Sequence, residues 1–202
     1  MPNAPAQTRT SGSTPSASND AGPVSRQWPD LPGHLIFWLL AAMGVAADLW
    51  TKSAVHDWLR TLPDQRYTVV QDYVWLVIRF NRGAAFSMFQ GRTGLLLAVS
   101  GLALLVVLGL FLFTSARQRL LQIALGLLTA GILGNLYDRL SLHHPEIHER
   151  GVRDWIEVVI PVINYRWPAF NVADSLLCIA VGLIVLLSFT SSSSRTPAHP
   201  RR

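Results

Sequence analysis

The chain of 202 residues has little charge, since only 14% of its residues are Asp, Glu, Lys or Arg, against about 25% in a typical soluble domain. A single cysteine excludes an internal disulfide and therefore a small disulfide-stabilised domain. Half of the residues are hydrophobic and the mean hydropathy is +0.30. This composition excludes an intrinsically disordered chain and a coiled coil, and it indicates a membrane protein.

Four apolar stretches predict four transmembrane helices. A helix needs about 20 residues to cross about 30 Å of hydrocarbon. The second stretch, 95–113, supplies 19 residues without a charge, and the others reach this length alone or with a flanking turn. We therefore expect a mainly α-helical integral membrane protein. Its helices are expected at about 34–52, 94–114, 119–138 and 170–189.

Both ends of the chain are polar and compositionally biased. Residues 1–33 are rich in Ser, Thr, Pro and Ala, and residues 191–202 in Ser and Arg. Such segments cannot bury enough apolar surface to offset chain entropy, so we expect two disordered tails around a membrane domain at 34–190. A cleaved signal peptide is an alternative for the first apolar stretch. Arg26 precedes it and small residues at 45–47 end it, but the polar leader is long for that purpose.

The connections between the helices differ in length. The short turn 114–119 predicts that the helices on either side are antiparallel neighbours. Within the long connection 53–93, segments 67–71 and 74–78 are rich in β-branched and aromatic residues, which predicts a pair of strands. Residues 56–59 could form a short interfacial helix before them. We expect a small β-sheet and a short helix outside the membrane.

The distribution of arginine predicts the orientation. The two tails and the 114–119 turn together hold seven Arg and no Lys, whereas ten of the twelve acids lie elsewhere, most of them around the long connections 53–93 and 139–169. Because cytoplasmic loops carry an excess of basic residues, we expect both termini and the turn in the cytoplasm. Orientation thus explains the net charge of +5, and we expect no nucleic-acid partner.

Several polar side chains lie where hydrocarbon makes them costly. Most of these groups have an ordinary explanation. Asp48 and Lys52, four residues apart, can form a helix-end ion pair. The polar residues of 135–139 can satisfy one another at a helix end, and Asn171 can be an N-cap. Capping does not explain Asp174, which lies one turn into the fourth apolar stretch.

An up-and-down order of the helices brings these groups to one side of the membrane. The end of the first helix, the end of the third and the start of the fourth meet there with both long connections. Asp154 in the second long connection, by itself an ordinary loop acid, could then approach Asp174. Two close carboxylates share a proton, so one can activate water while the other protonates the substrate. This arrangement predicts metal-free aspartyl hydrolysis.

Other chemistries have weaker support. His143, His144 and His148 lie in a polar loop without the spacing of a zinc motif. Cys178 is more simply a small packing residue, and no glycine-rich phosphate loop is present in the sequence. We expect neither a metal nor another cofactor.

Five segments in order resemble the bacterial lipoprotein signal peptidase (signal peptidase II) family. Each segment is a weak signal alone, but their order, spacing and membrane context match over residues 35–190. The segments are Asp48–Lys52, Asn81–Phe86, Gly134–Arg139, Val152–Ile156 and Phe170–Asp174.

The resemblance implies a four-helix inner-membrane aspartyl endopeptidase with both termini cytoplasmic and the active site near the extracytoplasmic face. It implies cleavage of prolipoproteins just before a diacylglyceryl-modified cysteine, and inhibition by the cyclic peptide globomycin. Lipidated prolipoproteins and membrane lipid are the partners we expect, for a monomeric enzyme. Asp154 and Asp174 would be catalytic. Asn81, Asn135, Arg139 and Asn171 would bind substrate, and Asp48, Lys52, Gly83 and Asp138 would support the site.

Two features depart from the family pattern. The stretch 141–150, which holds the three histidines, is longer than the usual link to the first catalytic acid, and the leader of about 30 residues is also longer than usual. Two other functions remain open. A proton-coupled carrier would use the same membrane charges as a relay, although the second helix has no polar relay residue. A non-catalytic assembly or anchoring protein would tolerate replacement of both aspartates.

Overall fold

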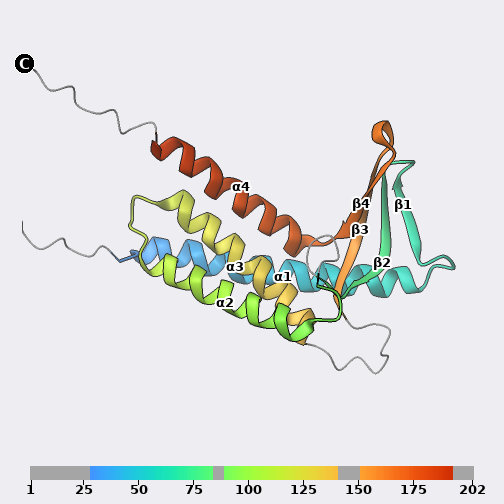
Figure 1. Cartoon of the computed structure of the whole chain (residues 1–202), viewed down its shortest axis with the longest axis horizontal. Helices are drawn as coiled ribbons and strands as arrows, with labels where there is room; N and C mark the ends of the chain where they lie inside the picture. The colour runs from blue at the N-terminus through green and yellow to red at the C-terminus, as the bar shows by residue number, and fades with distance from the viewer. Residues whose placement is uncertain (1–27, 84–88, 141–150, 193–202) are drawn as a thin grey trace, which may run out of the picture.

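The computed structural model describes residues 28–83, 89–140 and 151–192. Most of the polar leader, the histidine-containing stretch 141–150 and the tail from 193 lie outside the described residues. Within them, four helices form an elongated bundle with a β-sheet at one end (Figure 1). The helices are α1 (Leu31–Arg60), α2 (Thr93–Leu112), α3 (Arg119–Leu140) and α4 (Val172–Ser192).

All four helices are long and apolar enough to cross a membrane. Large apolar side chains on their outer surfaces, such as Leu102, Leu105 and Phe189, are exposed in the isolated chain. Apolar groups on the outside of a bundle suit a lipid environment, where hydrocarbon takes the place of water. The prediction of a mainly helical membrane protein with four spans is confirmed.

Helix α3 lies at the centre of the bundle and packs against the other three helices. Small residues allow this close packing, as they commonly do between membrane helices. A Cβ atom at Gly131 would stand 2.7 Å from the Ala173 carbonyl oxygen, and one at Gly44 would stand 2.6 Å from the Ala130 methyl group. The packing of α3 against α1 and against α4 therefore depends on glycine.

Helix α1 is longer than predicted. Asp30 caps it by accepting a hydrogen bond from the Gly33 amide (3.1 Å), and the helix then continues to Arg60. Residues 56–59, which we expected to form a separate interfacial helix, are its last turns. The reason is that no Gly or Pro interrupts the chain between the apolar stretch and that segment, while His56 and Leu59 are buried. The bounds of the other helices differ from the predicted ones by at most three residues.

The sheet has four antiparallel strands in the order β1-β2-β3-β4. Strands β1 (Arg66–Val70) and β2 (Val74–Asn81) form the predicted hairpin, with Tyr67 opposite Leu76. Strands β3 (Val152–Ile160) and β4 (Tyr165–Phe170) were not predicted, and Asp154 is a strand residue rather than a loop acid. Its pairing partner in β2 is Arg79, 75 positions earlier in the chain. Local sequence patterns do not reveal a pairing between residues so far apart.

The sheet positions the polar residues at one end of the bundle. Its strands run across the direction of the helices, and β4 leads through Asn171 directly into α4 (Figure 1). The turn between α2 and α3 lies at the opposite end, together with the N-terminal end of α1 and the C-terminal end of α4. The junction between sheet and bundle is where the predicted site residues meet.

Candidate active site

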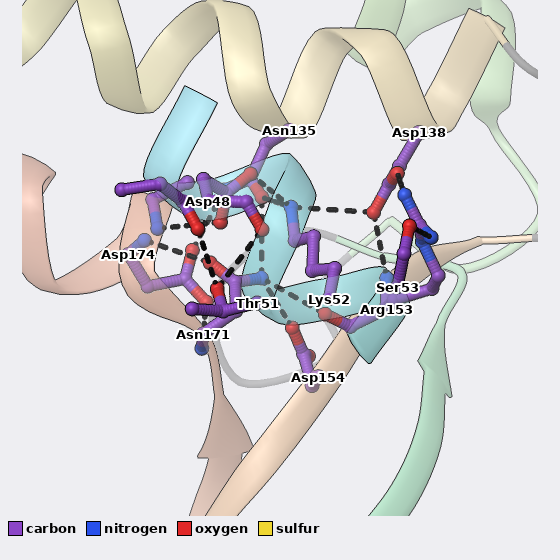
Figure 2. A network of polar contacts seen from close by, with 12 residues as sticks. Asp48, Thr51, Lys52, Ser53, Asn135, Asp138, Arg153, Asp154, Asn171 and Asp174 are labelled. Carbon is purple, nitrogen blue, oxygen red and sulfur yellow. Dashed lines mark hydrogen bonds and ion pairs between the residues drawn. The ribbon is translucent and has the colours of Figure 1, made fainter. Parts of the chain in front are cut away.

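The ten predicted site residues come from five elements that meet at this junction, and Figure 2 shows most of them. Polar side chains that are far apart in the sequence form one connected network of hydrogen bonds and ion pairs. The residues are Asp48 and Lys52 of α1, Asn81 and Gly83 at the end of β2, Asn135, Asp138 and Arg139 of α3, Asp154 of β3, and Asn171 and Asp174 at the start of α4.

Asp174 and Asn171 form a reciprocal cap at the start of α4. The Asp174 amide donates to Asn171 Oδ1 (2.9 Å), and the Asn171 amide donates to Asp174 Oδ2 (3.3 Å). This is a capping-box arrangement, in which the first and fourth residues satisfy each other's backbone amides. The expectation that capping does not account for Asp174 is therefore wrong. The other carboxylate oxygen of Asp174 accepts from Asn135 Nδ2 (2.7 Å).

Asn171 connects the two acids, because its backbone amide donates to the Asp174 carboxyl and its side chain contacts Asp154. While its side-chain oxygen accepts from the Asp174 amide, its Nδ2 donates to Asp154 Oδ1 (2.6 Å). Asn81 also hydrogen-bonds the Asp154 carboxyl, and its own Oδ1 accepts from the Gly83 amide (2.9 Å). One amide side chain thus fixes Asp154 relative to the first turn of α4.

The environment of Asp154 favours its protonated form. Burial raises the pKa of this carboxyl to about 7, and the nearby Asp174 charge acts in the same direction. The hydrogen bonds from Asn81 and Asn171 favour the charged form but do not offset burial. Near neutral pH, Asp154 therefore holds a proton much of the time. A carboxyl with such a pKa can donate a proton to a reacting group at physiological pH.

A buried ion-pair cluster supports the start of α4. Lys52 Nζ lies 2.7 Å from Asp48 Oδ2 and 3.2 Å from Asp138 Oδ2, and it donates to Asn135 Oδ1 (3.1 Å). The second oxygen of Asp48 accepts from the Ala173 amide (2.9 Å). That amide is one of the first-turn donors that a helix cannot satisfy internally. The cluster therefore ties α1 and α3 to the turn that carries Asp174.

Arg139 links α3 to the end of β2. Its guanidinium donates to the Gly83 carbonyl oxygen (3.2 Å) and lies near enough to Asp154 and Asp174 to interact electrostatically with both. Its Nε atom is buried and has no hydrogen-bond partner among the described residues. A hydrogen-bond donor in this position can bind an acceptor atom of a substrate. Residues 84–86, the rest of the Asn81–Phe86 segment, lie outside the described residues.

Arg153 belongs to the network although the sequence analysis assigned it no role. Its side chain forms an ion pair with Asp138 (2.8 Å) and donates to Ser53 Oγ of α1 (3.0 Å). A signal was present, since an arginine between an apolar residue and a candidate catalytic acid needs a partner if it is buried. Its partner on α3 could not be identified without the fold.

The arrangement suits acid–base chemistry on a bound water. One buried carboxyl with a raised pKa lies beside a second, less buried carboxyl, and Asn171 hydrogen-bonds one with its side chain and the other with its backbone amide. Among the described residues, no group of three or more His, Cys, Asp or Glu side chains could hold a metal. The histidines at 143, 144 and 148 are outside that part of the chain.

The chain is similar to known proteins over most of its length. The family model described as signal peptidase (SPase) II matches residues 40–190. The chain is 36% identical over 176 residues to the lipoprotein signal peptidase of Rhodopirellula baltica, covering 83% of this chain and 78% of the relative. It is 32% identical over 166 residues to that of Anoxybacillus flavithermus, covering 81% and 90%. A solved bacterial membrane enzyme superposes with a TM-score of 0.69 at 25% identity, covering 87% of this chain and 99% of that one.

Proposed function

Because this chain belongs to the signal peptidase II family, we propose that Asp154 and Asp174 are the catalytic pair of a lipoprotein signal peptidase. It is a membrane enzyme that removes signal peptides from prolipoproteins. The observation that carries the proposal is Asn171, which contacts both carboxyl groups: its side-chain Nδ2 donates to Asp154 and its backbone amide donates to Asp174. This contact keeps the pair in register for one substrate bond.

The two acids differ in environment, which supports different starting roles. Asp154 is buried and its pKa of about 7 favours a proton, whereas Asp174 is less buried. Asp174 takes a proton from water, and the hydroxide adds to the scissile carbonyl carbon as Asp154 protonates the carbonyl oxygen. The Asp174 proton then passes to the leaving nitrogen, and the carbon–nitrogen bond breaks. As the carbonyl re-forms, the hydroxyl proton returns to Asp154.

The neighbouring polar groups support binding of an extended peptide. The unpartnered Nε of Arg139 and the amides of Asn81, Asn135 and Asn171 surround the acids. Asp48, Lys52, Asp138 and Gly83 hold those groups in place. The outer helix faces are apolar, so the chains of a diacylglyceryl cysteine can stay in the bilayer while the peptide reaches the acids. Cleavage just before that cysteine follows from this placement.

The proposal includes orientation and organisation. The site lies near the extracytoplasmic surface, and both termini are cytoplasmic, in keeping with the arginines of the tails and of the 114–119 turn. The membrane domain, predicted at 34–190 and extended by the first residues of α1 and the last of α4, acts as a monomer in contact with lipid, between the polar tails. A monomer is sufficient because all ten site residues come from one chain.

Purified Asp154→Asn and Asp174→Asn variants test the catalytic pair with a lipidated prolipoprotein. Each should lower kcat by at least 1,000-fold, on the order of 4 kcal/mol of barrier, because neither amide can exchange the required proton. Asp57→Asn, on the exposed end of α1, is the matched control and should cleave normally. Thermal unfolding checks that the Asp174 variant keeps its helix cap. Turnover within twofold of wild type in either catalytic variant would contradict the proposal.

A further inference from the structure

Arg153 is attached to Asp138 by both its backbone and its side chain. Its amide donates to Asp138 Oδ2 (3.0 Å), while Nε (3.2 Å) and one terminal nitrogen (2.8 Å) donate to Asp138 Oδ1. The other terminal nitrogen donates to Ser53 Oγ (3.0 Å). One residue therefore joins β3 to α3 and to α1. Planar guanidinium groups form such forked contacts, which lysine cannot reproduce.

These contacts act directly beside the reacting carboxyl. Arg153 precedes Asp154 in β3, and its carbonyl oxygen accepts from Asn171 Nδ2 at 3.4 Å, the same atom that donates to Asp154. Arg153, the residue before Asp154, is therefore fixed at its amide, its carbonyl and its side chain. Among the described residues, no arginine or lysine forms an ion pair with Asp154 that would hold it in place.

Arg153 also balances charge in the buried cluster. Asp48 and Asp138 are both nearly inaccessible to solvent, and Lys52 lies within ion-pair distance of each. Arg153 supplies the second positive charge, and its side chain is itself only 14% exposed. Without it, two buried carboxylates would share one ammonium group, an arrangement that leaves a buried charge uncompensated.

We propose that Arg153 is a positioning residue, which holds the Asp154 carboxyl in its buried place through Asp138 and Ser53. This inference rests on the proposed function, because it gives Arg153 a role through Asp154. Loss of its side chain would loosen the start of β3, admit water to Asp154 and lower the pKa of that carboxyl towards its ordinary value. The charged and titratable groups that act on Asp154 or lie against it are Asp174 of α4, Lys52 and His56 of α1 and Arg139 of α3, and Arg79 is its register partner in β2.

The test compares Arg153→Met and Arg153→Lys with wild type, using full-length purified enzyme and a lipidated prolipoprotein. Arg153→Met should lower kcat at least tenfold with KM changed less than threefold. It should also move the alkaline limb of the pH–rate profile at least one pH unit lower. Arg153→Lys should recover only part of kcat, because it restores charge without the fork. Arg166→Met is the control, since Arg166 also pairs with an acid of β3, Glu157 (2.8 Å), but is largely exposed.

The outcomes separate the two proposals. Arg153→Met with wild-type kcat and an unmoved alkaline limb overturns the positioning role. A loss of activity that matches a loss of folded protein, with the limb unmoved in what remains, also overturns it. Asp154→Asn is assayed in parallel: if that variant stays active, the catalytic pair itself fails. If it is inactive while Arg153→Met behaves as wild type, only the inference about Arg153 fails.

Discussion

The Asn171 side chain contacts the Asp154 carboxyl and the Asp174 backbone amide, so the identity of its two polar atoms matters more than its volume. Its Oδ1 accepts from the Asp174 amide, whereas its Nδ2 donates to Asp154 Oδ1. A carboxylate in the same place would retain the cap but could donate nothing. The residue therefore allows capping and catalysis to be separated experimentally.

Asn171→Asp should keep the helix cap and fail in catalysis. Aspartate is as good an N-cap as asparagine, so the protein should still fold, with a lower melting temperature because the new carboxylate is fully buried among acceptors. However, the new carboxylate oxygen would replace the Nδ2 donor that lies 2.6 Å from Asp154 Oδ1. It would also place a third acid beside the pair. We expect kcat to fall at least 100-fold, about 2.7 kcal/mol of barrier. Near-normal kcat in the folded variant would show that the bridge is dispensable.

The raised pKa of Asp154 predicts loss of activity with rising pH. Because the protonated carboxyl is the acid of the proposed mechanism, kcat/KM should fall as pH rises through about 7. The stability of the folded protein should also fall with rising pH. Because the folded-state pKa of Asp154 lies above the ordinary 3.8, stability decreases from about pH 4 to about pH 7 and then levels off. Rates between pH 5 and 9 test this. A flat profile to pH 9 would refute it, and Asp154→Asn should lack the stability change.

The elements of the fold were not equally predictable. Apolar runs with flanking charges predict the four spans, because a bilayer demands about 20 apolar residues in each. The β1–β2 hairpin was visible because its strands are adjacent in sequence. Strand β3 was not, since it pairs with a strand more than 70 residues earlier. The predicted site residues did meet. Arg153 was missed because its contact with Asp138 forms only once β3 is placed in the sheet.

Helix packing predicts a strong effect of one methyl group on the site. A Cβ at Gly134 of α3 would collide with the Asp48 carboxylate and approach the Ala173 methyl group (3.2 Å). Gly134→Ala should therefore displace the start of α4 and lower kcat at least tenfold. Gly109→Ala in α2 is the matched control, since a Cβ there meets no atom within 4 Å. It should leave kcat unchanged and slightly favour the helix. Equal kcat for the two variants would exclude this packing role.

Across the whole molecule, the network around the acids lies at the sheet end of the bundle. A separate polar cluster around the Asp30–Arg119 ion pair and Gln122 lies at the other end. In α2, between Leu95 and Leu112, no side chain is charged. A proton-coupled carrier needs polar groups on both sides of the midplane along one path. The network around the two acids is confined to one end, which suits a peptidase acting at the membrane surface better than a carrier.

The proposed orientation can be tested by cysteine labelling in intact cells. In a Cys178→Ala background, Val162→Cys places a thiol on the β3–β4 connection, where residue 162 is 94% exposed. A membrane-impermeant maleimide should label it from outside. Ser115→Cys, in the turn between α2 and α3, should react only after the membrane is permeabilised. The reverse pattern would invert the topology, and an activity assay confirms that both variants are folded.

The spacing of Asp48 and Lys52 has a consequence for biosynthesis. The chain is made from its N-terminus, so α1 reaches the membrane long before the residues of α3 and α4 that later surround its charges exist. The two side chains are four residues apart on one helix and pair at 2.7 Å without help from any other element. Each neutralises the other while α1 inserts. Asp48 and Lys52 therefore enter the bilayer as a ready-made pair, and the proposed active site is complete only when the last helix arrives.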